Sequence, residues 1–98
     1  MKLINVTNSH SKMVYNQLNN TDANMIKVYT IGNTTVIYTD AAKHAEIVIK
    51  NDNRNILPNE IDFVHKYFQR KLNDGTYDFE HISYLESPGL IEMSIVKK

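Results

Sequence analysis

The clearest pattern in the sequence is a pair of neighbouring segments in which β-branched and aromatic residues predominate. Residues 25–31 and 34–39 are rich in Val, Ile, Tyr and Thr, and only a Gly-Asn pair separates them. Such segments favour strands, and a two-residue connection that begins with glycine favours a type II′ turn, because glycine adopts a positive φ at little cost. The sequence therefore predicts an antiparallel hairpin with Ile31 opposite Thr34.

This register divides the side chains of the hairpin between two faces, because successive residues of a strand point to opposite sides of a sheet. One face carries Ile26, Val28 and Ile37. The other face carries five residues of mixed character: Met25, Lys27, Tyr29, Val36 and Tyr38. We expect helices to cover the first face, since it is wholly apolar, and the second face to lack a cover within the molecule.

The segments around the hairpin predict three further elements. Residues 3–6 are a short, mostly apolar stretch typical of a strand. A Thr-Asn-Ser run follows, and its side-chain oxygens suit the start of a helix over residues 9–20. After a polar link, residues 45–49 predict another strand beside the hairpin.

A second helix is predicted from Pro58, which suits a first helical turn, to about Leu72. Ile61, Val64, Phe68 and Leu72 fall within about 80° of one another on the helical wheel. This narrow stripe is typical of a helix that packs one side against a core.

The end of the sequence predicts a closing hairpin, with strands over 82–86 and 90–96 joined by a Ser-Pro-Gly turn. A short helix over 79–85 is the alternative. The predicted order is β-α-β-β-β-α-β-β over a single domain of residues 1–98. This order indicates a two-layer α+β fold, with a mostly antiparallel sheet and two helices on one face.

Composition narrows the classes of function. The 98 residues include 11 Lys+Arg and 11 Asp+Glu, so net charge gives no general attraction to nucleic acid or to anionic membranes. Cysteine is absent, which excludes disulfides, thiolate metal sites and thiol nucleophiles. No apolar run approaches the ~20 residues of a membrane span, so we expect a cytoplasmic protein without a membrane partner.

The start of the first predicted helix is a candidate anion site, made of Ser9, His10, Ser11 and Lys12. Unpaired backbone N–H groups at a helix N-terminus attract anions. This hypothesis predicts a protein that handles phosphate or another small anion. In the alternative interpretation, the serines only cap the helix and His10 borders its apolar stripe.

His44 and Glu46 lie two residues apart on a predicted strand, so their side chains share a face and are potential metal ligands. Nothing nearby supplies a third ligand at a diagnostic spacing, and an exposed pair on a strand is the simpler interpretation. The sequence contains no zinc-protease, nucleophile-elbow or phosphate-loop motif. We therefore expect no metal, no cofactor and no enzymatic activity.

Phe63 and Tyr67 lie one turn apart on the second predicted helix, about 120–160° from its apolar stripe. A helix that packs on one sheet does not need this aromatic pair, so the pair is a candidate protein contact, as is the uncovered hairpin face. Two alternatives stay open. Loops or the closing hairpin cover the pair, and the helices are divided between both faces of the sheet.

The same helix supports a weaker hypothesis. Lys66, Arg70 and Lys71 lie close to Tyr67, and basic residues beside an aromatic ring suit stacking on single-stranded nucleic acid. Two acidic neighbours, Glu60 and Asp62, and the net charge of zero disfavour nucleic-acid binding.

Residues 1–11 (MKLINVTNSHS) and 27–38 (KVYTIGNTTVIY) resemble a small family of uncharacterised proteins from lactic-acid-type Gram-positive bacteria. That family is catalogued as a domain of unknown function. The resemblance implies a cytoplasmic bacterial protein, and it supplies no catalytic or binding residues.

Apolar surface in excess of what one small two-layer domain buries, without catalytic groups, favours one function over the others. We expect a non-enzymatic protein-interaction or regulatory module that self-associates as a homodimer or binds another protein. The candidate contacts are the Tyr29/Tyr38 hairpin face and the Phe63/Tyr67 pair.

Overall fold

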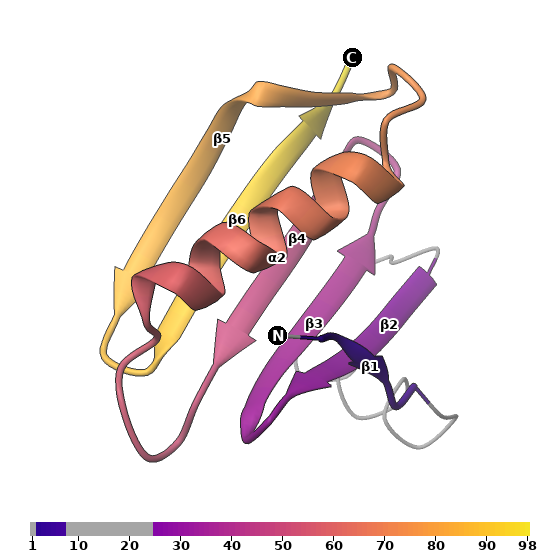
Figure 1. Cartoon of the computed structure of the whole chain (residues 1–98). Coiled ribbons are helices and arrows are strands. Elements are labelled where there is room, and N and C mark those ends of the chain that lie inside the picture. The colour runs from indigo at the N-terminus through magenta and orange to yellow at the C-terminus, as the bar shows by residue number, and fades with distance from the viewer. Residues whose placement is uncertain (1, 8–24) are drawn as a thin grey trace.

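The computed structural model describes residues 2–7 and 25–98, and it shows one antiparallel sheet crossed by a helix (Figure 1). The described elements are β1 (Ile4–Asn5), β2 (Met25–Ile31), β3 (Thr34–Asp40), β4 (His44–Lys50), α2 (Pro58–Lys71), β5 (Tyr77–Ser87) and β6 (Leu90–Lys97). The strand order is β1-β2-β3-β4-β6-β5, and every neighbouring pair is antiparallel. The α+β class is therefore confirmed.

One of the two expected helices lies within the described residues. The described residues contain one helix, α2, which is too short to cross a membrane. The other predicted helix, over 9–20, lies outside the described residues.

The hairpin of β2 and β3 has the predicted register in full. Ile31 lies opposite Thr34, and Tyr29 lies opposite Val36. Gly32 adopts a φ of +57°, in the region that favours glycine. The register is well specified because the turn and the alternation of side chains both require it.

Helix α2 begins at Pro58 and ends at Lys71, within one residue of the prediction. Its predicted apolar stripe is confirmed, since Val64 and Phe68 are fully buried and Ile61 and Leu72 are packed against the core at its margins.

The closing hairpin is also confirmed, and residues 79–85 belong to a strand. Strand β5 begins five residues earlier than predicted, at Tyr77. Tyr77 pairs with Lys97 and Ile82 pairs with Ile95, so five steps along β5 match two along β6. This bulge breaks the alternation of side chains, which explains why the sequence pattern missed the start of the strand.

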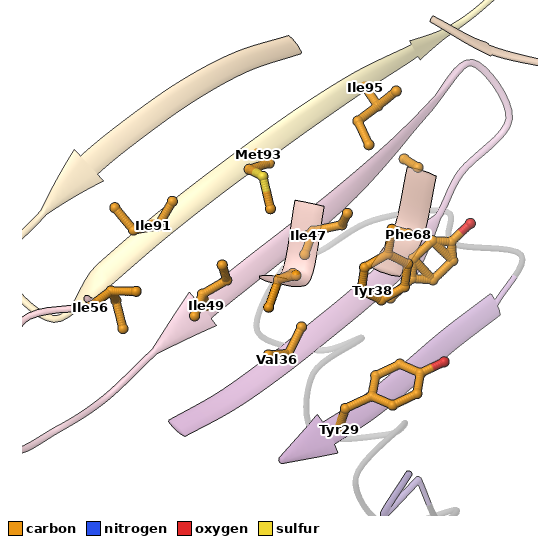
Figure 2. Packing of buried hydrophobic residues seen from close by; sticks show 12 residues of the cluster. Tyr29, Val36, Tyr38, Ile47, Ile49, Ile56, Phe68, Ile91, Met93 and Ile95 are labelled. Carbon is orange, nitrogen blue, oxygen red and sulfur yellow. The ribbon is translucent and has the colours of Figure 1, made fainter. Parts of the chain in front are cut away.

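The face of the sheet beneath α2 corrects the prediction about the hairpin. Tyr29 and Tyr38 point toward α2 and are only 2% and 3% exposed, in a core that also contains Val36, Ile47 and Met93 (Figure 2). The expectation that this face lacks a cover is therefore wrong. The tyrosines fit under a helix because their rings pack inside while their hydroxyls reach polar partners at its margin.

The opposite face of the hairpin is buried as well. Ile26, Val28 and Ile37 alternate with the residues beneath α2, and each is 4–5% exposed. Both faces of β2 and β3 are therefore inside the molecule, as strands at the centre of a fold are.

Candidate functional site

Most residues of the predicted hairpin interface belong to the core and not to a free surface. Tyr29, Val36 and Tyr38 are buried beneath α2, and Lys27 is half-buried. The side chain of Met25 lies outside the described part of the protein. An interface through the three buried residues would require α2 to leave the sheet.

The Phe63/Tyr67 pair lies at the margin of the core, and both side chains are half-buried. The Tyr67 ring packs edge-on against Tyr29 and Phe68, with centroids 5.9 Å and 5.1 Å away. Lys71 Nζ donates to the hydroxyls of Tyr67 and Tyr29 at 3.3 Å and 3.4 Å. Tyr67 and Lys71 thus attach the end of α2 to β2.

The residues of the nucleic-acid hypothesis are similarly engaged. Lys66 Nζ lies 3.0 Å from a carboxylate oxygen of Asp62, one turn earlier on the helix. Since Lys71 contacts two tyrosines and the Tyr67 ring packs on the core, neither presents a free stacking platform. Arg70 is exposed at the end of the helix.

Two predicted sites remain, the candidate anion site and the candidate pair of metal ligands. The candidate anion site, Ser9 to Lys12, lies outside the described residues. His44 and Glu46 do share a face, with Nε2 3.2 Å from Oε1. Within residues 2–7 and 25–98, no group of three potential metal ligands gathers around them or elsewhere.

The sequence reasoning missed an ion pair between Glu60, which is buried, and Arg54, whose side chain is 38% exposed. The guanidinium donates to both oxygens of the Glu60 carboxylate, at 2.8 Å to Oε1 and 3.1 Å to Oε2. Thr34 Oγ1 donates to Oε2 at 2.8 Å, and the Leu57 N–H donates to Oε1 at 2.9 Å. Glu60 is visible in the sequence as an acidic residue in a first helical turn, but its partner six residues earlier lies across a loop.

These hydrogen bonds control the charge of Glu60. The hydrogen bond from Arg54 lowers the pKa of Glu60 to about 2, against the opposing effect of burial. The contacts from the Leu57 N–H and Thr34 act in the same direction as Arg54. A carboxylate that is ionised and bonded on both oxygens is a poor proton acceptor at neutral pH, so this pair serves the structure and not acid–base catalysis.

Asn51 connects the cluster formed by Arg54, Glu60 and Thr34 to two hairpin turns. Its Nδ2 donates to Thr34 Oγ1 at 3.0 Å, beside the β2–β3 turn. Its backbone N–H donates to the Gly89 carbonyl at 2.9 Å, in the β5–β6 turn. The cluster therefore joins both turns to the start of α2 at one end of the sheet.

A second polar network holds the start of β5 at the other end. Tyr77 donates to Asp40 Oδ1 at 2.9 Å and lies 3.3 Å from the hydroxyl of Tyr38. Lys97 Nζ is 3.0 Å from the same Asp40 oxygen. Burial, followed by the hydrogen bond with Tyr77, raises the pKa of Tyr38 well above its usual value, so Tyr38 stays neutral.

Strand β5 presents the most exposed pair of adjacent large apolar side chains in the described residues. Tyr84 is 50% exposed and Leu85 is 67% exposed. Tyr84 is paired with Met93 and points to the α2 side, where its hydroxyl lies 3.2 Å from His65 Nδ1. Leu85 points to the face away from α2.

Two open depressions border this strand. One, of ≈ 330 Å³, lies mainly on the face away from α2 and is lined by Glu46, Ser83, Tyr84, Leu85, Glu92 and Ser94. The other, of ≈ 370 Å³, is next to the β5–β6 turn and is lined by Asn55, Ile56, Glu86, Ser87, Pro88 and Ile91. The sequence pattern gave no sign of this surface, because Tyr84 and Leu85 alternate as any strand residues do.

Comparison with known proteins decides the family. A family model described as a domain of unknown function (DUF1827) matches residues 1–96. The chain belongs to the DUF1827 family. It is also similar to a solved structure described as a conserved protein of unknown function from Streptococcus thermophilus LMG 18311, with 37% identity and a TM-score of 0.87. That match covers 100% of this chain and 98% of the streptococcal chain. None of the curated proteins matches the chain.

Membership of the DUF1827 family confirms the resemblance carried by residues 1–11 and 27–38. The streptococcal match shows that the fold is shared with a bacterial relative over the whole chain. Neither description names an activity, a ligand or a partner. The function of this DUF1827 protein therefore has to come from its own surface.

Proposed function

We propose that this DUF1827 protein is a non-enzymatic protein-interaction module that self-associates, and that its contact surface is the outer side of β5. The observation that carries the proposal is the exposure of Tyr84 and Leu85, two adjacent large side chains on a strand at the edge of the sheet. This surface replaces the Tyr29/Tyr38 face, which α2 covers.

The two edges of the sheet differ in what they offer a partner. Strand β1 is an edge of two residues, whereas β5 is an edge of eleven residues (Figure 1). An edge strand presents unpaired backbone N–H and C=O groups, which form a ready template for another strand. Other exposed apolar side chains, such as Ile4 and Val96, lie on other strands.

The polar groups of the protein support a binding role. Among the described residues, the ionisable groups whose pKa values shift most are Glu60 and Tyr38, and both lie in networks that hold turns and strand ends together. Neither lines the depression beside Leu85. That depression has apolar and polar sides, as protein contact surfaces do.

Sedimentation velocity from low-micromolar to near-millimolar concentration tests this function. We expect the wild-type protein to form a concentration-dependent dimer and the Leu85→Glu variant to stay monomeric. Ile4→Glu is the matched control, because Ile4 is 56% exposed on the opposite edge, and it should dimerise like the wild type. A wild-type protein that is monomeric throughout, or an equal loss in both variants, contradicts the proposal.

A further inference from the structure

We infer that the second copy binds by strand pairing: β5 of one protomer lies antiparallel to β5 of the other, about a twofold axis next to Tyr84. This inference rests on the proposed self-association and adds its geometry. The pairing joins the two six-stranded sheets edge to edge into one continuous sheet.

The bulge limits which part of β5 can pair. Regular pairing with β6 runs from Ile82 to Ser87, and the irregular segment lies between Tyr77 and Ile82. A bulged strand bends and loses its regular row of outward N–H and C=O groups. The second copy therefore has residues 82–87 as its straight template, and Glu86 is the one charged residue among them.

Charge then selects the register. In an antiparallel pair, residues that lie directly opposite each other point to the same face of the sheet. A twofold axis perpendicular to the sheet therefore passes next to one residue that lies opposite the same residue of the second copy. An axis at Ser83 or Ile82 moves the second copy toward the bulged segment, where Glu80 or Asp78 approaches Glu86. Like charges directly opposite are destabilising.

An axis at Leu85 fails for a different reason. It brings Pro88 opposite Ile82, and Pro88 lies in the β5–β6 turn and has no N–H to donate. An axis at Tyr84 avoids both problems. It sets Ile82 opposite Glu86 and Ser83 opposite Leu85.

The Tyr84 register also gives each exposed side chain a contact. The two Tyr84 rings meet on the α2 side, where cross-strand aromatic pairs stabilise a sheet. On the other face Leu85 lies beside Ser83 of the second copy, and both residues line the ≈ 330 Å³ depression. The depressions of the two protomers thus border one shared surface.

Cysteine cross-linking tests the register directly, because the natural sequence contains no cysteine. Opposite residues of an antiparallel pair have Cα atoms about 4.5–5.5 Å apart, within the reach of a disulfide. We expect a mixture of Ser83→Cys and Leu85→Cys proteins, oxidised with glutathione disulfide, to form a heterodimer between the two variants. Tyr84→Cys alone should form a homodimer, since this residue faces its own copy.

Each variant of the mixture serves as a control for the other. When either variant pairs with itself, the Cα atoms of the two cysteines are about 8 Å apart in this register. That distance is beyond the reach of a disulfide, so little cross-linked dimer should form. Ile4→Cys, exposed on the opposite edge, should give none. Both Ser83 and Leu85 are exposed, so we expect circular dichroism to show that these variants fold as the wild type does.

The outcomes separate this inference from the proposed function. Faster cross-linking of Ser83→Cys or Leu85→Cys alone than of the mixture overturns the register. Failure of the mixture and of Tyr84→Cys, with a wild-type dimer in sedimentation, overturns strand pairing and leaves self-association standing. A wild-type monomer without any cross-linking overturns both.

Discussion

Tyr38 and Phe68 stack with their ring centroids 5.1 Å apart and their planes 13° from parallel, which joins the centre of the sheet to the last turns of α2 (Figure 2). Tyr29 packs edge-on against the same Phe68 ring at 5.7 Å. One phenylalanine thus contacts both tyrosines of the hairpin face, and together with Val64 and Tyr67 of α2 it buries this face.

We expect Phe68→Ala to destabilise the protein by about 3–5 kcal/mol, because it leaves a cavity under α2. Phe63→Ala is the matched control on the same helix, and its cost should be clearly smaller because Phe63 is half-buried. Urea unfolding at neutral pH measures both. Equal losses would mean that the Phe68 ring does not fill the centre of the core.

Val64→Asp should prevent folding, because Val64 is fully buried and the change places an unpaired charge in the core. Far-ultraviolet circular dichroism and the dispersion of amide signals in an NMR spectrum report the result. His65→Asp, at the next position of α2, is half-buried and should leave the fold intact. A folded Val64→Asp protein would contradict the packing of α2 on the sheet.

Acid should destabilise the protein through Glu60. Folding lowers the pKa of Glu60 from 4.5 to about 2, so its contribution is present above pH 4.5 and is lost as the pH falls toward 2. The shift corresponds to about 3 kcal/mol when integrated over this range. Denaturant titrations between pH 2 and 7 measure the loss.

The Glu60→Gln variant identifies the group responsible. It should be less stable than the wild type at neutral pH, and its stability should vary less between pH 5 and 2 because the titrating carboxyl is gone. Asp62→Asn, at an exposed position of the same helix, should keep the wild-type slope. An unchanged slope in Glu60→Gln would assign the acid sensitivity to other groups.

Alanine at Gly89 should cost more than alanine at Gly32. Both glycines have a positive φ, of +74° and +57°, which is strained for any other side chain by about 1–2 kcal/mol. At Gly89, an added Cβ would also lie 2.6 Å from the Asn51 carbonyl oxygen, whereas nothing lies within 4 Å at Gly32. Thermal unfolding of the two variants gives the comparison, and a more severe effect at Gly32 would contradict the close approach.

The sequence predicts the helix and the strands of this fold better than it predicts how they pack against one another. The β2–β3 hairpin and the stripe on α2 depend on residues close together in the chain, so local patterns suffice to place them. The covered face of the hairpin depends on Phe68, thirty residues beyond Tyr38. Counting apolar residues on each face of the hairpin alone therefore favours the wrong face for α2.

The two features that sequence reasoning missed, the Arg54–Glu60 ion pair and the exposed side chains of β5, are non-local for similar reasons. Arg54 meets Glu60 only because a loop folds back on the start of the helix, and no regular spacing marks such a pair. Tyr84 and Leu85 are exposed because β6, and not β5, lies next to β4. Strand order follows from packing of the whole chain, which alternation within one strand does not report.

That strand order has a consequence for synthesis on the ribosome. Strand β6 inserts between β4 and β5, although β5 is translated first. Until β6 leaves the exit tunnel, β4 has an open edge and β5 has no neighbour to pair with. The nascent chain thus carries two unmatched strands, and completion of the sheet waits for the residues that end this hairpin.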